Sequence, residues 1–226
     1  INHSSFVENI KKVCNNLPNG TNNIRIKANY NSGEYREEKK LEQIHLLLGF
    51  EGINYHNDDY YSLLVYSSLL GGGMSSRLFQ EIREKRGLVY GISSFSASYT
   101  DTGIFGIYCG TGEQQITELI PVLCDQLNSS PTNITEQEIK RGKAQLKASL
   151  MMGRESAFRR CESAARQLLV FNRVIEPSEI LKKIENVNVE SVKNIAQLIV
   201  SRPLTISSIG PIKKLETLDK IQDRLK

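Results

Sequence analysis

Arg83 and Tyr90 are the residues whose types and spacing best suit chemistry on a peptide. Arg83 lies on an expected helix, Tyr90 begins the next expected strand, and Gly87 between them allows the chain to reverse direction. A guanidinium presents a planar fork of N–H donors and a phenol adds another, which suits peptide carbonyls or a developing oxyanion. The alternative is structural: Arg83 pairs with Glu81 or Glu84, and Tyr90 belongs to the core.

Three consecutive glycines, Gly71, Gly72 and Gly73, precede this pair. Glycine permits close backbone approach and positive φ angles, so such a loop can cradle phosphate when a helix N-terminus follows it. A P-loop requires the pattern GxxxxGK(S/T), whereas Gly73 is followed here by MSSR. A flexible connection between helices is therefore the simpler interpretation, and a nucleotide-binding module is the weaker alternative.

The sequence contains no recognisable metal motif. None of its three histidines, His3, His45 and His56, lies at ligand spacing from another. His45 is in an apolar segment and is expected to be a packed or hydrogen-bonded core residue, whereas His56 is expected in a solvated loop. No CxxC pair occurs among the four cysteines, so we expect reduced, mostly buried thiols at Cys14, Cys109, Cys124 and Cys161.

The composition is that of an ordinary globular protein. Hydrophobic residues make up 39% of the 226 residues and charged residues 24%, with a mean hydropathy of −0.33. The 29 Lys and Arg residues only slightly exceed the 25 Asp and Glu residues and are scattered, so no nucleic-acid partner is expected. No apolar run suits a membrane span or a signal peptide. We expect an intracellular protein, in a bacterial cytoplasm or a mitochondrial matrix.

Two helices are expected to flank the three glycines. Apolar spacing predicts a helix over residues 58–70 that the glycines end. Ser75 or Ser76 is expected to cap a second helix, which buries Phe79 and ends at Gly87. This second helix would carry Arg83.

The strands are expected to follow apolar or β-branched runs. Residues 41–51 predict a buried strand, and residues 88–99 and 103–110 flank an Asp-Thr-Gly turn and predict a β-hairpin. A late, short strand is expected over residues 203–209. These strands stand among many predicted helices, which indicates an α+β fold.

The other helices are predicted from periodicity and capping signals. Thr111 with Gln114, and Thr135 with Glu138, match the capping-box spacing before two long helices. Further helices are expected over residues 4–17, with Ser4 or Ser5 as cap, over residues 153–171, after Pro177, from Asn188 and after Pro211. Residues 20–40 are rich in Asn, Gly, Glu and Lys, the composition of a linker or an exposed ribbon.

The segment LGGGMSSRLFQEIREKRGLVYGISSF, followed by YTDTGIFGIYCG, resembles the second half of the M16 metallopeptidases, particularly the processing-peptidase branch. In that family a glycine-rich loop, a helix ending in Arg-x6-Tyr and a hairpin occur in this order. The similarity extends more loosely from Leu41 to about Pro211. The resemblance implies a mixed, largely antiparallel sheet covered by helices on one face.

The resemblance also implies a domain organisation. Residues 1–20 would be the final helix of the preceding M16 half, residues 21–40 a linker and residues 41–226 the C-terminal peptidase-like domain. The chain lacks an initiator Met and is expected to begin inside a longer protein. In the family two such halves face each other around a chamber, so the expected partner is an N-terminal half, a homologous subunit or a second copy in a homodimer.

The resemblance assigns roles to residues of this chain. Zinc and its HxxEH motif, absent here, belong to the first half of the family's enzymes, so this fragment alone should be inactive. Arg83 and Tyr90 would hold the backbone of a peptide substrate and support the tetrahedral intermediate, and Gly71 to Gly73 would help to handle substrate. The implied function is a zinc metalloendopeptidase acting on unfolded peptides or presequences. The alternative is a catalytically silent homologue that serves as scaffold or partner subunit.

Overall fold

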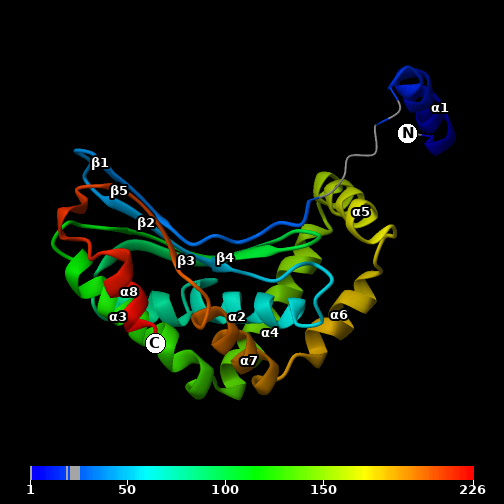
Figure 1. Cartoon of the computed structure of the whole chain (residues 1–226). Helices are drawn as coiled ribbons and strands as arrows, with labels where there is room; N and C mark the ends of the chain where they lie inside the picture. Colours follow the sequence, from blue (N-terminus) through cyan, green and yellow to red (C-terminus); the bar gives the residue numbers. More distant parts are fainter. Residues whose placement is uncertain (1, 19, 21–25) are drawn as a thin grey trace.

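One mixed sheet forms the centre of the molecule. The structure, a computed structural model, describes residues 2–18, 20 and 26–226, and in this part five strands pair in the order β1-β5-β2-β4-β3 (Figure 1). The strands are β1 (Glu34–Glu38), β2 (Ile44–Glu51), β3 (Val89–Ser98), β4 (Gly103–Thr111) and β5 (Thr205–Gly210). β1 is parallel to β5, and the other neighbouring pairs are antiparallel. The expected α+β fold with a largely antiparallel sheet is confirmed.

Helices cover one face of this sheet (Figure 1). The helices are α1 (His3–Cys14), α2 (Tyr60–Gly71), α3 (Ile116–Asn133), α4 (Glu136–Gly153), α5 (Ala157–Phe171), α6 (Pro177–Asn186), α7 (Val189–Val200) and α8 (Leu218–Arg224), with a π-helix (Phe79–Glu84) and a 3-10 turn (Ile212–Lys214). α2 is central, since it packs against β3, α4 and α7. None of these helices is long and apolar enough to cross a membrane.

The sheet has a buried face and an open face because side chains alternate along each strand. On β2, Ile44, Leu46, Leu48 and Phe50 are fully buried against the helices. Burial of such a side chain contributes about 2 kcal/mol. The residues between them, such as His45, point to the other side, where no helix lies over the strands in Figure 1. This open face is accessible to a ligand, and the candidate site lies beside it.

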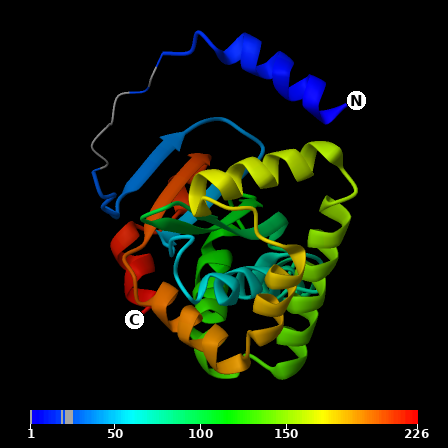
Figure 2. The ribbon, with the colours of Figure 1, turned by 90° about the vertical axis from the view of Figure 1, so that its right-hand side faces the viewer.

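The N-terminal region differs in part from the expectation. α1 is present, but Asn2 caps it, because its side-chain oxygen accepts from the Ser5 N–H at 3.1 Å. α1 buries no residue and lies apart from the body in both views (Figures 1 and 2). Within the segment expected to be a linker, Glu34–Glu38 forms an edge strand, so the linker interpretation is wrong for these residues. Residues 21–25 lie outside the described part of the chain.

Two capping boxes were expected before α3 and α4, and one forms. Thr135 caps α4, and Glu138 returns the bond to the Thr135 backbone, which confirms that prediction. Thr111 instead completes β4, where its buried hydroxyl donates to the Leu88 carbonyl at 2.6 Å. α3 begins later, at Ile116, without a side-chain cap, so the Thr111 prediction is wrong. Thr111 pairs with Ile44 of β2 and Val89 of β3, so it is not available to cap the helix.

Candidate functional site

The segment that carries Arg83 is a π-helix rather than the α-helix expected. The Lys85 N–H donates to the Gln80 carbonyl at 3.0 Å, five residues earlier. Ser76 does not cap this helix, since its hydroxyl is buried with no hydrogen-bond partner among the described residues. The helical turn ends as predicted before Gly87, which has a φ of +64°. Short π-helical segments are rare and occur frequently at functional sites.

Arg83 is exposed and forms no ion pair within the described residues. Its Cζ lies 4.7 Å from the centre of the Phe79 ring. The nearest expected partner, Glu81, accepts instead from Lys85 Nζ at 2.7 Å and from Arg86 Nη2 at 3.0 Å. The alternative that Arg83 pairs with Glu81 or Glu84 is therefore wrong for the described residues, and its guanidinium keeps its N–H donors available.

Tyr90 is also a surface residue. Its exposed fraction is 65%, so the alternative that it belongs to the core is wrong. The pairing of β3 with β4 skips it: Val89 is opposite Thr111, and Gly91 is opposite Gly110. Such a bulge changes the direction of a side chain and is common next to active sites. The sequence did not predict this bulge.

The turn between the π-helix and β3 brings the two predicted residues to one corner of the sheet. The Gly87 N–H donates to the Arg83 carbonyl at 3.1 Å, and the Leu88 N–H donates to the Ile82 carbonyl at 3.0 Å. These bonds fix the last residues of the helix to the first of the strand. An exposed guanidinium and an exposed phenol thus emerge from consecutive, tethered elements.

The three glycines lie at the end of α2, beside the middle of β3, and two of them are packed closely. A Cβ on Gly71 would lie 2.4 Å from the Ser94 nitrogen of β3, and a Cβ on Gly72 would lie 2.6 Å from Ser68 Cα. Gly73 has more room, since a Cβ there would lie 3.3 Å from Gln145 Nε2, the end of a flexible side chain. The two positive φ angles of glycines in the described chain belong to Gly87 and Gly210. Close approach, not unusual backbone conformation, therefore explains Gly71 and Gly72.

Two paired glycines lie on the open face beside Tyr90. Gly91 on β3 pairs with Gly110 on β4, which pairs in turn with His45 on β2. His45 is exposed rather than a core residue, because it occupies an outward position of β2, although it is hydrogen-bonded as expected, with Nδ1 2.7 Å from the Tyr108 hydroxyl. An added Cβ at Gly91 would meet nothing within 4 Å, so an extended chain could approach the sheet closely there. Gly110 is covered, since a Cβ there would lie 2.9 Å from Gln43 Oε1.

The described residues hold no group of three His, Cys, Asp or Glu side chains that could bind a metal ion. This part of the chain therefore does not fit a zinc site. All four cysteines are free thiols; Cys109 and Cys124 are buried, whereas Cys14 and Cys161 are exposed. The expectation of mostly buried thiols holds for half of them. His56 lies exposed in a loop, as predicted, with its ring centre 5.4 Å from that of Phe171.

Comparisons with known proteins agree with this architecture. A chain of complex III2 from Candida albicans superposes with a TM-score of 0.87 at 21% identity, covering 100% of this chain and 56% of that one. A Rickettsia felis protein named uncharacterized zinc protease is 34% identical over 212 residues, 93% of this chain and 52% of the relative. The human mitochondrial-processing peptidase subunit beta is 29% identical over 198 residues, 83% of this chain and 40% of its own.

The chain spans about half the length of the first of these curated relatives. The family model described as Peptidase M16 inactive domain matches residues 1–146, which include the glycines, Arg83, Tyr90 and the hairpin. The chain therefore belongs to the M16 peptidase family, and it matches that family's inactive domain.

Proposed function

We propose that this chain is the substrate-positioning half of an M16 zinc metalloendopeptidase. The observation that carries the proposal is that Arg83 and Tyr90 are both exposed, on the π-helix and on the strand that directly follows it, at one corner of the sheet. Neither side chain has a hydrogen-bond or ion-pair partner among the described residues, so their donors are free for a ligand. The relationship to proteins named zinc proteases supplies the reaction class.

The chemistry proposed for these residues is positioning and charge stabilisation. Arg83 donates to carbonyl oxygens of an extended peptide and holds its backbone in register. Tyr90 donates its O–H to the oxygen that becomes negative as the scissile carbonyl turns tetrahedral. The open space at Gly91, where an added Cβ would meet nothing within 4 Å, lets the peptide lie close to the sheet beside Tyr90. Zinc would be bound by residues outside this chain.

The remaining expectations belong to the same proposal. The substrates are unfolded peptides or presequences, and the partner is an N-terminal half, a homologous subunit or a second copy of this chain. The division into residues 1–20, 21–40 and 41–226 stays a prediction, with Glu34–Glu38 assigned to the sheet. The flexible-loop role of Gly71 to Gly73 stays a prediction as well, and so does the compartment.

The test uses the intact assembly that contains this chain and its zinc-binding partner. We expect Arg83→Ala and Tyr90→Phe each to lower kcat/KM for peptide hydrolysis about tenfold or more, without lowering the thermal unfolding midpoint. Tyr99→Phe is the matched control, because Tyr99 is 52% exposed just beyond the other end of β3. Near-normal turnover by both variants would remove the proposed role. An intact assembly that hydrolyses no peptide would instead favour the silent scaffold.

A further inference from the structure

We infer that Phe79 is a positioning residue for Arg83: its ring holds the guanidinium in place without using any of the guanidinium's N–H donors. This inference rests on the proposed function, since it assigns Phe79 a role only through Arg83. It adds to that function a residue that neither the motif nor the family match singles out. Three features of the structure carry it.

The first feature is the ring itself. Phe79 is half-buried and packs against the hydrophobic core, so its position is fixed by the body of the domain. Arg83 Cζ lies over this ring, 4.7 Å from its centre. A cation over an aromatic face is attracted by the ring's quadrupole. The guanidinium thus rests on a rigid platform although it is exposed to solvent.

The second feature is that the nearby carboxylate of Glu81 is bonded to other residues. Glu81 lies two residues before Arg83, but Lys85 and Arg86 hold it with hydrogen bonds of 2.7 and 3.0 Å. A carboxylate paired with Arg83 would occupy its donors and cancel its charge. A phenyl ring does neither, because it contacts the face of the guanidinium and leaves the N–H groups at its edge. The segment therefore orients Arg83 while keeping it available to bind carbonyl oxygens.

The third feature is the turn that follows the π-helix, which fixes the backbone end of the side chain. The Arg83 carbonyl accepts from the Gly87 N–H at 3.1 Å, so the backbone of Arg83 is anchored to the turn that leads to Tyr90. With its backbone anchored and its guanidinium on the ring, Arg83 has few rotamers left to lose when substrate binds. Such pre-organisation reduces the entropy cost of binding and of reaching the transition state.

The experiment compares Phe79→Leu with Phe79→Tyr in the intact assembly. Leucine keeps an apolar side chain in the core but has no π face, so we expect kcat/KM for peptide hydrolysis to fall about fivefold. Tyrosine keeps the ring, so Phe79→Tyr should retain activity within about twofold of wild type. In the Arg83→Ala background, Phe79→Leu should cause no further loss, because the group that Phe79 positions is gone.

The outcomes separate this inference from the proposed function. If Arg83→Ala itself has near-normal kcat/KM, the proposed function fails. If Arg83→Ala is impaired but Phe79→Leu is as active as wild type, or causes an equal loss with and without Arg83, the positioning role is overturned and the proposed function stands. Should Phe79→Leu unfold at a much lower temperature, Phe79→Met and the Phe79→Tyr rescue make the same comparison with core volume retained.

Discussion

At the scale of single residues, Glu138 shows how one side chain joins two elements. It closes the capping box of α4 and also receives two hydrogen bonds from Arg77, at 2.5 and 2.7 Å, from the segment that leads into the π-helix. The two side chains are only 12% and 13% exposed. Burial raises the pKa of Glu138, but the hydrogen bonds from Arg77 and Thr135 outweigh it and lower the pKa to about 2. The ionised form is therefore strongly preferred in the folded protein.

The first prediction concerns Glu138→Gln. The substitution should lower the free energy of unfolding by about 2 kcal/mol at pH 7, because the charge-assisted bonds are lost. The folded-state pKa is lower than the usual 4.5, so this stabilisation is present above pH 4.5 and is lost as the pH falls toward 2. Urea unfolding of both proteins at pH 7 and pH 3 measures it. A gap that does not narrow at pH 3 would contradict the assigned cause.

The second prediction separates the glycines by their contacts. Gly71→Ala should lower the free energy of unfolding by about 1–3 kcal/mol, because a methyl group there meets the Ser94 backbone at 2.4 Å and α2 must move away from β3. Gly73→Ala is the matched control, since its nearest neighbour is the flexible end of Gln145, and we expect a change within about 0.5 kcal/mol. Equal effects in thermal or urea unfolding would show that the close approach at Gly71 is not what limits this position.

Sequence patterns at the residue scale were reliable where the interaction is local. Thr135 and Glu138, and likewise Asn188, cap their helices as predicted because both partners lie within one turn. Thr111 matches the same sequence pattern, yet it pairs with β2 and donates its hydroxyl to Leu88, and both partners are distant in sequence. His45 was misplaced for the same reason: an apolar run does not show which of its residues face outward. Both predictions failed because they depend on strand pairing between distant residues, which a short sequence pattern does not contain.

At the scale of elements, the sequence located the helices and strands better than it described their geometry. The hairpin β3–β4 and the central helix α2 were predicted within a few residues. The π-helix and the bulge at Tyr90 were not, because each inserts one residue into a regular element and depends on how its neighbours pack. Arg83 lies in the first of these irregularities and Tyr90 in the second. β1 was missed because its residues, EYREE, are mostly charged and lie at an edge of the sheet.

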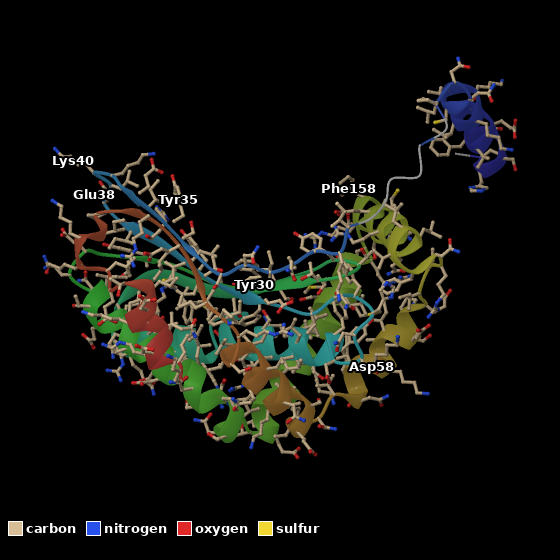
Figure 3. The ribbon with its side chains drawn as sticks, viewed as in Figure 1. Tyr30, Tyr35, Glu38, Lys40, Asp58 and Phe158 are labelled. Atoms are coloured by element: carbon tan, nitrogen blue, oxygen red, sulfur yellow. The ribbon has the colours of Figure 1, made fainter. Side chains whose placement is uncertain are left out.

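The third prediction tests what holds this edge strand. Arg36 of β1 donates to the Leu215 carbonyl at 3.1 Å and to the Glu216 carbonyl at 2.5 Å, near the C-terminal end of the chain. Arg36→Ala removes these bonds, so amide hydrogen exchange in β1 should become about tenfold faster. Lys40→Ala is the control, because Lys40 is exposed beyond the end of β1 (Figure 3). Unchanged protection of β1 in Arg36→Ala would mean that pairing with β5 suffices.

At the scale of the whole molecule, the domain has one core and two peripheral helices. α1 and α5 bury no residue, although both have a strongly amphipathic pattern. Phe158 at the start of α5 is 75% exposed (Figure 3). The pattern correctly predicted that these segments are helical, but a pattern does not say what a helix packs against. The single core lies between the sheet and the helices, and its buried residues come mainly from β2, β3, β4, β5, α2, α3 and α7.

The fourth prediction uses the cysteines, because two of them lie on the peripheral helices and two lie in the core. Cys14 and Cys161 lie exposed on α1 and α5, whereas Cys109 on β4 and Cys124 on α3 lie within the core. Burial raises the pKa of the thiols of both Cys109 and Cys124 to about 12, which keeps them protonated and unreactive in the folded state. A maleimide should therefore label two thiols of the native protein within minutes and the other two only when the core opens.

The relative rates of the slow pair test whether the core unfolds as one unit. Because Cys109 and Cys124 pack in the same cluster from opposite layers, we expect them to be labelled together, at the rate of global unfolding, and to accelerate equally with added urea. Mass spectrometry of the labelled peptides distinguishes the two sites. Much faster labelling of Cys124 alone would mean that α3 detaches before the sheet opens. The helical layer would then be a separate cooperative unit, and the sheet would keep its open face and the corner bearing Arg83 and Tyr90 without α3.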